Sequence, residues 1–475
     1  MLRFRPARPA FALALAALLL VGAAPMAEAQ VGRIETKQYE NGGVYEGTFK
    51  DGLQHGQGTY RLPNGYEYTG AWVEGEILGQ GQARFPDGSI YEGEFARGQP
   101  DGFGRIAYAD GGSYEGAWIA GSKEGEGVVV YADGTRFEGT FAAGQPTGRG
   151  VLTAPNGYRY EGDWVAGVKE GEGTITYPDG SRYEGGMVQG QRAGQGRLVT
   201  AEGLEYVGTW DGGRIHGEGR LAQPNGDVYE GQLVNGRREG EGRIAYASGG
   251  SYEGGFLGDL RHGQGRFEGA DGYVYEGSWA EGRIEGTGLV RYPDGTVYEG
   301  ALLDGLAHGE GAITYPDGAR YEGGWQEGVM HGAGVASYAD GTVYEGAFVA
   351  GLPEGEGTMT YADGYSYAGT WLGGEPHGTG IARYANGTVY EGGFAEGLRA
   401  GEGRLTRPDG FSYTGGWRGG QMHGAGRATY ATGDVYTGSF IDGRRAGQGV
   451  IVYADGTEVE GLWEDGQLVR EEASN

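Results

Sequence analysis

The sequence predicts an all-β fold, an elongated, twisted single-layer antiparallel sheet of tandem 23-residue β-hairpins. Three observations predict this fold. An aromatic-Glu-Gly type triplet that begins at Tyr45 returns every 23 residues, without insertion or deletion, as far as Val459. Glycine makes up 107 of the 475 residues, and 92 of these glycines occupy five fixed positions of the repeat. Apolar or aromatic residues alternate with polar ones around each triplet, which is typical of half-buried strands.

Turn residues divide each repeat into strands. Positions are counted here from the triplet aromatic residue, which is position 0. In the segment 177–181, Tyr-Pro-Asp-Gly-Ser, Pro and Asp suit the centre of a type I turn and Gly suits the left-handed residue that follows. Eight prolines share position 18 and four share position 9, and because proline donates no ladder hydrogen bond we expect both positions to be connectors.

The turn fixes which residues face each other. Closing the hairpin at 177–181 pairs position 15 with the next position 0, and the glycine at position 13 with the next position 2. Side chains alternate along a strand, so Ile175, Tyr183, Gly185 and Met187 share one face while Glu184 points to the other. The predicted structural residues are, as examples of four repeats, Tyr45, Gly47, Tyr91, Gly93, Tyr183, Gly185, Tyr321 and Gly323.

The two ends of the chain differ from the repeats. Residues 1–29 combine three early arginines, an apolar run and Ala27-Glu28-Ala29, the form of a secretory signal peptide cleaved after Ala29. An uncleaved anchor is the alternative, but the apolar run of about 14 residues is shorter than the roughly 20 that span a bilayer. We therefore expect export to the periplasm or medium, a linker at 30–38, an array of about 19 repeats at 39–467 and an acidic tail at 468–475. Of these repeats, counted from Tyr45, 18 are complete and the last is partial.

The repeat resembles a known family. Tyr183-Glu184-Gly185 followed by Gly190, and His331-Gly332-Ala333-Gly334, resemble the MORN (membrane occupation and recognition nexus) repeat. The resemblance extends over residues 39–467, and with the signal peptide it suggests a bacterial exported form. It implies a scaffold or interaction surface, and it also implies a possible membrane association, since MORN arrays accompany a phosphoinositide kinase in plants.

Charge limits the partners. The formal net charge is −28 for the whole chain and −30 for the chain after residue 29. Nucleic acid is a poor partner, because binding it requires Lys and Arg to replace counterions. The same charge makes anionic membrane lipid an unlikely ligand.

Residues that could bind a metal or act in catalysis lie in rows along the array, and the sequence predicts no metal site or catalytic site among them. All seven His share position 10, where successive repeats lie about 9.6 Å apart, too far for shared zinc ligation, so we expect no metal and no cofactor. We expect their rings to pack in a connector. Glu follows the triplet aromatic in 14 of 19 repeats as a solvated row, and no nucleophile or phosphate-loop motif is present. We therefore expect a protein that is not an enzyme.

All nine tryptophans share position 4, near the end of a hairpin, where we expect partial exposure. They form the candidate interaction face: Trp72, Trp118, Trp164, Trp210, Trp279, Trp325, Trp371, Trp417 and Trp463. They are 46 residues apart except for one gap of 69 residues between Trp210 and Trp279. Because the turns are also atypical there, we expect a bend or weak point between about residues 200 and 270.

The sequence thus predicts a non-enzymatic scaffold of the cell envelope that binds unidentified proteins or a second copy of itself. Open strand edges at both ends favour self-association. Two alternatives remain: a glycan or cell-wall module that stacks sugars on the Trp and Tyr rows, and a membrane-associated lipid-binding array. The sequence identifies neither the partner nor the oligomeric state.

Overall fold

The computed structural model describes residues 32–471, and within them every regular element is a β-strand. The chain divides into two compact units at Pro178/Asp179. The predicted signal peptide at 1–29 lies outside the described residues. Among the described residues, no helix is long and apolar enough to cross a membrane.

Unit 1 contains thirteen strands among its described residues 32–178. They are β1 (Ile34–Gln38), β2 (Val44–Lys50), β3 (Leu53–Arg61), β4 (Glu67–Val73), β5 (Glu76–Arg84), β6 (Ile90–Ala96), β7 (Gln99–Ala107), β8 (Ser113–Ile119), β9 (Ser122–Val130), β10 (Arg136–Ala142), β11 (Gln145–Thr153), β12 (Arg159–Val165) and β13 (Val168–Thr176).

Unit 2 contains twenty-six strands among its described residues 179–471. They are β14 (Arg182–Val188), β15 (Gln191–Val199), β16 (Glu205–Asp211), β17 (Arg214–Ala222), β18 (Val228–Val234), β19 (Arg237–Ala245), β20 (Gly250–Leu257), β21 (Leu260–Gly269), β22 (Val274–Ala280), β23 (Arg283–Arg291), β24 (Val297–Leu303), β25 (Leu306–Thr314), β26 (Arg320–Gln326), β27 (Val329–Ser337), β28 (Val343–Val349), β29 (Leu352–Thr360), β30 (Ser366–Leu372), β31 (Glu375–Arg383), β32 (Val389–Ala395), β33 (Leu398–Thr406), β34 (Ser412–Arg418), β35 (Gln421–Thr429), β36 (Val435–Ile441), β37 (Arg444–Val452), β38 (Glu458–Glu464) and β39 (Gln467–Glu471).

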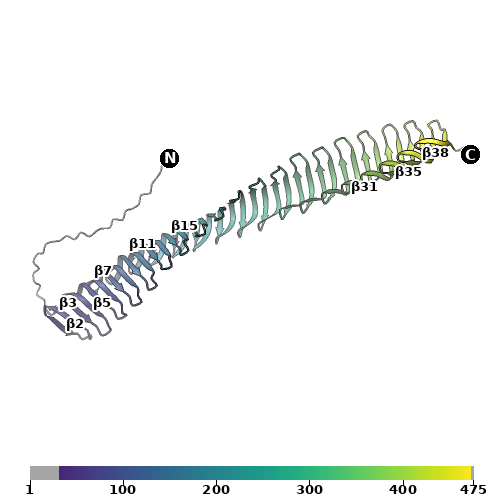
Figure 1. Ribbon diagram of the computed structural model, residues 1–475. Coiled ribbons are helices and arrows are strands. Elements are labelled where there is room, and N and C mark those ends of the chain that lie inside the picture. Colours follow the sequence, from purple (N-terminus) through teal and green to yellow (C-terminus); the bar gives the residue numbers. More distant parts are fainter. Residues whose placement is uncertain (1–31, 472–475) are drawn as a thin grey trace, which may run out of the picture. The chain divides into compact units, whose positions relative to one another are not determined.

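Within each unit the strands follow one another in chain order, and each pairs antiparallel with the strand before it and the strand after it (Figure 1). A strand of about seven residues alternates with one of about nine, so that one repeat contributes two strands. The predicted all-β class, the single layer and the hairpin repeat are confirmed. Each unit is an open meander of paired strands.

The predicted hairpin register is also confirmed. In unit 1, Tyr60 pairs with Tyr68 and Gly58 with Gly70, which are the expected partners of positions 15 and 13. Pro63 lies in the turn between these strands, where the Leu62 N–H donates to the Tyr66 carbonyl at 2.8 Å. Position 18 is therefore a connector, as predicted.

The second turn of each repeat is tighter than expected. Val73 pairs directly with Glu76, and the two central residues, Glu74 and Gly75, have φ angles of 52° and 89°. Positive φ at both central positions defines a type I′ turn, whose twist matches that of the flanking strands. This geometry explains the glycine at position 7.

The prediction that position 9 is a connector was wrong, because this position lies inside the longer strand. Pro100 pairs with Phe95 across the turn, and its carbonyl accepts a hydrogen bond from the Gly121 N–H at 2.9 Å. The ladder with the next strand starts only at Gly102, so no donor is required at residue 100. Position 10 also lies in the strand, and His55 in β3 is an example, so the histidine rings do not pack in a connector.

A β-bulge follows position 9. Gly93 pairs with Gly104 and Phe95 with Pro100, so one residue of β6 faces three residues of β7. The middle one, Gly102, has a φ of 105°, which side chains rarely tolerate. The glycine at position 11 is therefore required by the bulge.

The sheet extends beyond both predicted boundaries of the array. Residues 34–38, expected in the linker, form β1, and Lys37 pairs with Tyr45 of β2. Residues 468–471, expected in the tail, belong to β39, and Glu471 pairs with Gly461 of β38. Each added strand supplies main-chain partners to a repeat that would otherwise end the sheet.

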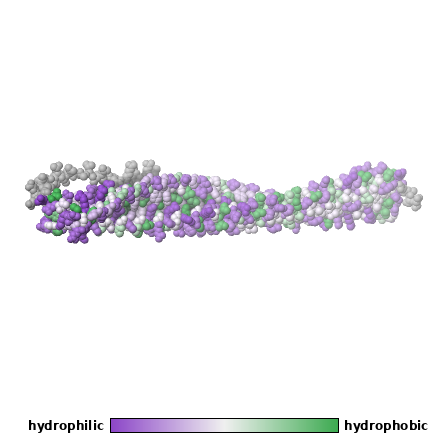
Figure 2. All heavy atoms as spheres, turned by 90° about the horizontal axis from the view of Figure 1, so that it is seen from below, coloured by the Kyte–Doolittle hydropathy of each residue, from purple (hydrophilic) through white to green (hydrophobic). Residues whose placement is uncertain are grey.

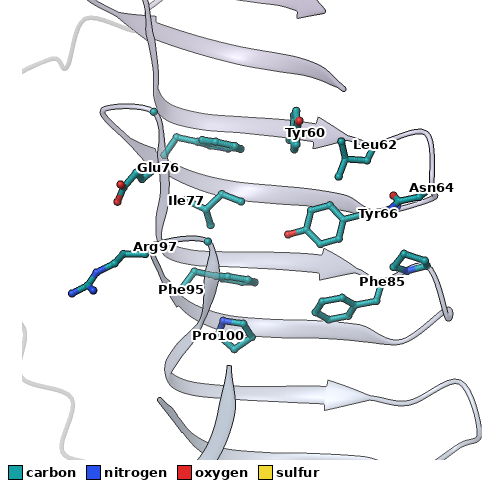
Figure 3. Close-up of a pocket in the computed structure, with 14 residues that line it drawn as sticks. Tyr60, Leu62, Asn64, Tyr66, Glu76, Ile77, Phe85, Phe95, Arg97 and Pro100 are labelled. Carbon is teal, nitrogen blue, oxygen red and sulfur yellow. The ribbon is translucent and has the colours of Figure 1, made fainter. Parts of the chain in front are cut away.

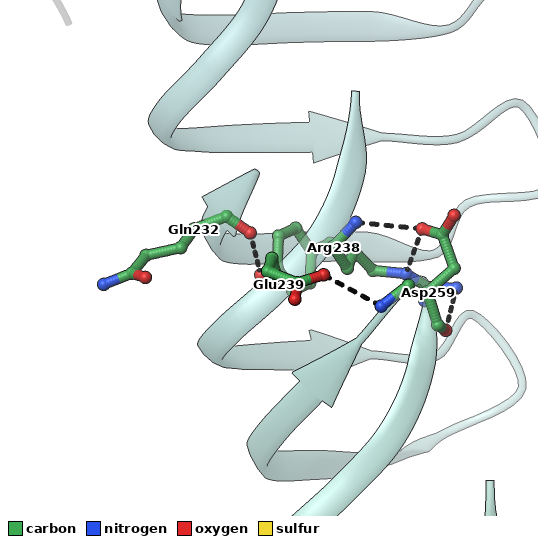
Figure 4. Close-up of polar contacts among 6 residues, drawn as sticks. Gln232, Arg238, Glu239 and Asp259 are labelled. Carbon is green, nitrogen blue, oxygen red and sulfur yellow. Dashed lines mark hydrogen bonds and ion pairs between the residues drawn. The ribbon is translucent and has the colours of Figure 1, made fainter. Parts of the chain in front are cut away.

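The region of the expected bend keeps its strand pairing, from β16 to β22. One adaptation is visible where Asp259 replaces the usual glycine with a φ of 74° (Figure 4). The Asp259 carboxylate accepts hydrogen bonds from the Arg238 main-chain N–H at 2.9 Å and from Arg238 Nε at 3.3 Å, and Glu239 accepts from the Gly258 N–H at 2.9 Å. These contacts hold the unusual turn. The bend itself stays a prediction.

Candidate functional site

The sheet of each unit has an aromatic face and a polar face. In β6, Tyr91, Gly93 and Phe95 are buried while Glu92 and Glu94 are exposed. The aromatic face is therefore formed by positions 0, 2, 4, 9, 13, 15, 17 and 21. The polar face holds the Glu row, some of whose members pair with arginines, as Glu322 does with Arg320 at 2.7 Å. The row is solvated, as expected.

The tyrosines at position 0 form the floor of the aromatic face. Tyr45, Tyr91, Tyr183 and Tyr321 are 2% exposed or less. The Tyr91 hydroxyl donates to the Glu94 carbonyl at 2.9 Å. A Cβ added at the paired glycines of positions 2 and 13 would overlap the tyrosine ring, so these positions must be glycine; the predicted examples Gly47, Gly93, Gly185 and Gly323 are all buried.

Burial also sets the electrostatics of this floor. Loss of hydration raises the pKa of Tyr45, Tyr68, Tyr114 and Tyr206 to about 12. At neutral pH these rings are therefore uncharged, and their hydroxyls are occupied by main-chain carbonyls. The floor tyrosines are structural.

The expectation that the tryptophans are partly exposed was wrong, because all nine are between 2% and 8% exposed. Trp118 packs edge-on against Tyr91 and Tyr114 with ring centroids 5.2 Å apart, and its Nε1–H donates to the Gly104 carbonyl at 3.2 Å. The nine rings of the predicted interaction face are thus core residues. No tryptophan face is left free to stack on a sugar, so the glycan alternative loses its basis in these residues.

Unit 1 has a groove on its aromatic face (Figure 3). Ile77, Phe95 and Pro100 lie on one side and Tyr66 and Phe85 on the other. The groove has a volume of about 570 Å³ and adjoins a depression of about 930 Å³ with which it shares Phe85, Pro86, Gly98 and Pro100. We call the two together the unit 1 groove, and its further lining includes Tyr60, Leu62, Asn64, Trp72, Ile106, Tyr108, Trp118 and Lys123.

The unit 1 groove is apolar where a partner would be buried and polar at its rim. Its lining contains apolar and aromatic side chains, with charged side chains such as Glu76 and Arg97 at the edge, where Figure 3 shows both pointing outward. Binding surfaces of this composition gain affinity from desolvated aromatic and aliphatic contacts.

The same place is filled in several repeats of unit 2. The Arg192 guanidinium lies 4.1 Å from the centroid of the Trp210 ring and donates to the Gly213 carbonyl at 2.7 Å. Arg445 covers Trp463 in the same way, at 4.0 Å. At position 9, therefore, unit 1 has the apolar Ile77 and Pro100 beside the groove, whereas these repeats of unit 2 have an arginine over a tryptophan ring.

Sequence reasoning missed the rows at positions 9 and 17. The sequence did contain a signal for the row at position 9, because this position faces position 4, where the tryptophans lie, and is basic in seven repeats. These residues are Lys123, Lys169, Arg192, Arg238, Arg261, Arg399 and Arg445. In the described part of the chain, no group of three or more His, Asp or Glu residues is placed to hold a metal ion.

Comparison with known families identifies the repeat. A model of the MORN repeat matches 18 times, beginning at 45–65 and ending at 436–458, and the matches together include well over half of the chain. The chain belongs to the MORN repeat family. It is a repeat array of a family that is generally non-catalytic. The 18 matches correspond to the 18 complete repeats predicted from the sequence, and the last, partial one is not matched.

No curated protein matches the chain. Among solved structures, the TCP domain of Drosophila melanogaster SAS-4 (dCPAP), in complex with a proline-rich motif of Ana2, is 18% identical with a TM-score of 0.21, and the match includes 45% of this chain and 99% of that one. The TCP10 domain of Danio rerio CPAP is 18% identical with a TM-score of 0.21, over 47% and 98%. A streptogramin B lyase is 12% identical with a TM-score of 0.11, over 62% and 91%.

Proposed function

We propose that this MORN array is an exported, non-enzymatic scaffold of the cell envelope that binds protein partners on the aromatic face of unit 1. The observation that carries the proposal is the unit 1 groove, which adjoins Trp72 and Trp118 and whose lining includes the apolar side chains of Ile77, Phe85 and Pro100. Export rests on the predicted signal peptide, and self-association through β1 or β39 is the alternative mode of assembly.

A protein partner fits this surface better than a small substrate does. The lining of the groove contains neither His nor Cys, the side chains used most often as general base and as thiol nucleophile. The groove is bounded by side chains of successive strands, which favours a ligand that extends along the array. The net charge of −28 keeps nucleic acid away from the same surface.

The test is peptide selection against the full chain. A displayed peptide library is selected on the wild-type protein, and the selected peptides are then measured on an Ile77→Arg/Pro100→Arg variant, which copies the covered arrangement of Arg192 and Trp210. The proposal predicts at least ten-fold weaker binding to this variant, because each arginine occupies the space of the ligand.

The matched control is Val73→Arg/Ile119→Arg, which adds the same charge at two exposed residues outside the groove, at the ends of β4 and β8. It should bind the peptides as the wild type does. Equal loss in both variants would mean that charge alone reduces binding, and no loss in either would show that the unit 1 groove is not the interface.

Export is tested separately. A fusion of residues 1–60 to alkaline phosphatase should be active in a bacterial host, because this enzyme requires the oxidising periplasm. An inactive fusion that accumulates in the cytoplasm would contradict export.

A further inference from the structure

A second surface lies on the aromatic face of unit 2, where five successive repeats have tyrosine at position 17. The first four, Tyr292, Tyr315, Tyr338 and Tyr361, are here called the tyrosine row, and their side chains are between 37% and 44% exposed. The fifth, Tyr384, is less exposed. Burial raises the pKa of Tyr292 and Tyr338, and to a smaller extent so do the neighbouring Tyr315 and Tyr361. The four residues occupy the same position in consecutive repeats.

An adjacent repeat shows what the tyrosine row faces. The Arg261 side chain, at position 9, reaches across the face and donates to the Tyr246 hydroxyl at 2.6 Å. A residue at position 9 therefore faces the residue 15 places before it, at position 17 of the preceding repeat, and one long side chain is enough to connect them. In the tyrosine row the facing residues are Ala307, Met330, Pro353 and Pro376.

The facing residues leave the phenols without a side-chain partner. Ala, Met and Pro offer no strong acceptor, and in the described part of the chain no side-chain hydrogen bond is formed by Tyr292, Tyr315, Tyr338 or Tyr361. Burial raises the pKa of Tyr292 and Tyr338, so these hydroxyls keep their protons and can donate at neutral pH. The surface combines exposed donors with exposed aromatic rings.

The spacing of the row selects the conformation of a ligand. Two strands at about 4.8 Å each separate successive tyrosines by about 9.6 Å. A polyproline II segment advances about 9.3 Å in three residues, so its mismatch over three steps is about 1 Å. Seven residues of α-helix advance about 10.5 Å, and the mismatch grows to about 3 Å. A β-strand would need about three residues for each step, which turns alternate side chains away.

The negative charge around the tyrosine row favours a ligand with basic residues. Each tyrosine of the row is followed two residues later by an exposed aspartate at the turn: Asp294, Asp317, Asp340 and Asp363. The Thr296 and Thr342 main-chain N–H groups donate to Asp294 and Asp340, which lowers the pKa of both carboxyls and keeps them ionised. Asp304 and Glu327 add negative charge at the opposite edge of the same repeats.

We propose that the tyrosine row binds a basic, proline-rich segment of a partner protein in the polyproline II conformation. Prolines pack against the tyrosine rings and the apolar residues that face them, main-chain carbonyls of the segment accept hydrogen bonds from the phenols, and Lys or Arg side chains approach the aspartates. The inference rests on the proposed scaffold function, and it concerns a surface separate from the unit 1 groove.

The test uses fluorescence anisotropy with the full chain and three labelled twelve-residue peptides: (Pro-Pro-Lys)4, (Pro-Pro-Glu)4 and (Gly-Ser-Lys)4. The inference predicts that (Pro-Pro-Lys)4 binds at least ten-fold tighter than either of the others. Equal binding of (Gly-Ser-Lys)4 would overturn it, because charge without the proline conformation would then suffice.

Variants locate the site. Tyr315→Phe/Tyr338→Phe keeps both rings and removes two donors, so binding should weaken about five-fold for each hydroxyl. Asp317→Asn/Asp340→Asn should weaken binding and flatten its salt dependence. The matched control, Tyr246→Phe, removes a hydroxyl at the same repeat position that already bonds Arg261, and it should leave binding unchanged.

Other outcomes separate this inference from the proposed function. If (Pro-Pro-Lys)4 fails to bind while the library-selected peptides still bind the unit 1 groove, only this inference is wrong. If neither binds, both proposals fail. A dimer detected by light scattering that dissociates in Tyr315→Phe/Tyr338→Phe would place a second copy on the tyrosine row and would also overturn the inference.

Discussion

Repeats 68–123 of unit 1 and repeats 183–279 of unit 2 have the same aromatic floor but present it differently. In unit 1, Ile77 and Pro100 leave an apolar groove above Trp72 and Trp118. In unit 2, Arg192 covers Trp210 by a cation–π contact at 4.1 Å. One side chain in each 23-residue repeat therefore changes the surface without changing the strands beneath it.

The comparison separates two kinds of position. Positions 0, 2, 4 and 13 build the floor and are fixed by packing in both regions, whereas position 9 lies above the floor and varies. In the view of Figure 2, hydrophilic residues are interspersed with small hydrophobic patches. The polar face carries exposed aliphatic side chains at the hairpin edge, such as Leu303 and Leu306, whereas the unit 1 groove lies on the aromatic face, where we expect recognition.

The largest effect is expected from alkaline pH. The folded-state pKa of floor tyrosines such as Tyr68 and Tyr206 is raised to about 12, from about 10 in an unfolded chain. Because the pKa is higher in the folded chain than in the unfolded chain, the protonated tyrosines contribute fully to the stability of the fold below pH 10. This contribution is lost as the pH rises toward 12. Circular dichroism should show both regions unfolding together over this interval, and a sheet that persists above pH 12 would contradict the shared floor.

The next largest effect is expected for the tryptophans. Trp118→Ala and Trp210→Ala should each lower the free energy of unfolding by about 3–5 kcal/mol, measured by denaturant titration, because each empties a buried site. Phe103→Ala is the control, since Phe103 is exposed on the polar face, and it should change stability by less than about 0.5 kcal/mol. If a tryptophan variant bound the selected peptides more weakly but remained as stable as the wild type, the tryptophans would be interaction residues and not only core residues.

A smaller loss is expected when the floor is overpacked. Gly104→Val and Gly196→Val should each cost about 1–3 kcal/mol, because a Cβ at either site meets a tyrosine ring. The cost should be similar in both regions, since the floor is the same. Gly98→Asn, at a turn where a Cβ meets nothing, should cost less than about 1 kcal/mol, and a larger loss there than at Gly104 would contradict this account.

The smallest change in stability is expected at position 9. Ile77→Arg should cover the unit 1 groove and Arg192→Ile should uncover Trp210, each changing the free energy of unfolding by about 1 kcal/mol or less. Binding of the neutral dye Nile red should fall in the first variant and rise in the second. Ile119→Arg, outside the groove, should change dye binding in neither direction. Dye binding that does not depend on position 9 would remove the distinction between the two regions.

Much of this fold could be predicted from the sequence because a period of 23 residues determines the pairing of every strand. The pairs Tyr60–Tyr68 and Gly58–Gly70 follow from the turn at Pro63 alone. Tertiary packing decided the rest. Trp118 was expected to be exposed near a hairpin end, but the rings of Tyr91 and Tyr114 enclose it. Position 9 was expected in a connector because proline donates no ladder hydrogen bond, but the ladder with the next strand starts only at position 11, as at Gly102, so proline is tolerated within the strand.

The most direct test of the central claim is site-specific photo-crosslinking in the producing cells. A photoreactive phenylalanine analogue at Leu62 or Phe85, in the unit 1 groove, should form adducts with another polypeptide. The same analogue at Glu92 or Glu115, on the polar face, should form few. Adducts that arise only from the polar-face positions, or equally from both faces, would contradict the assignment of the aromatic face as the binding surface.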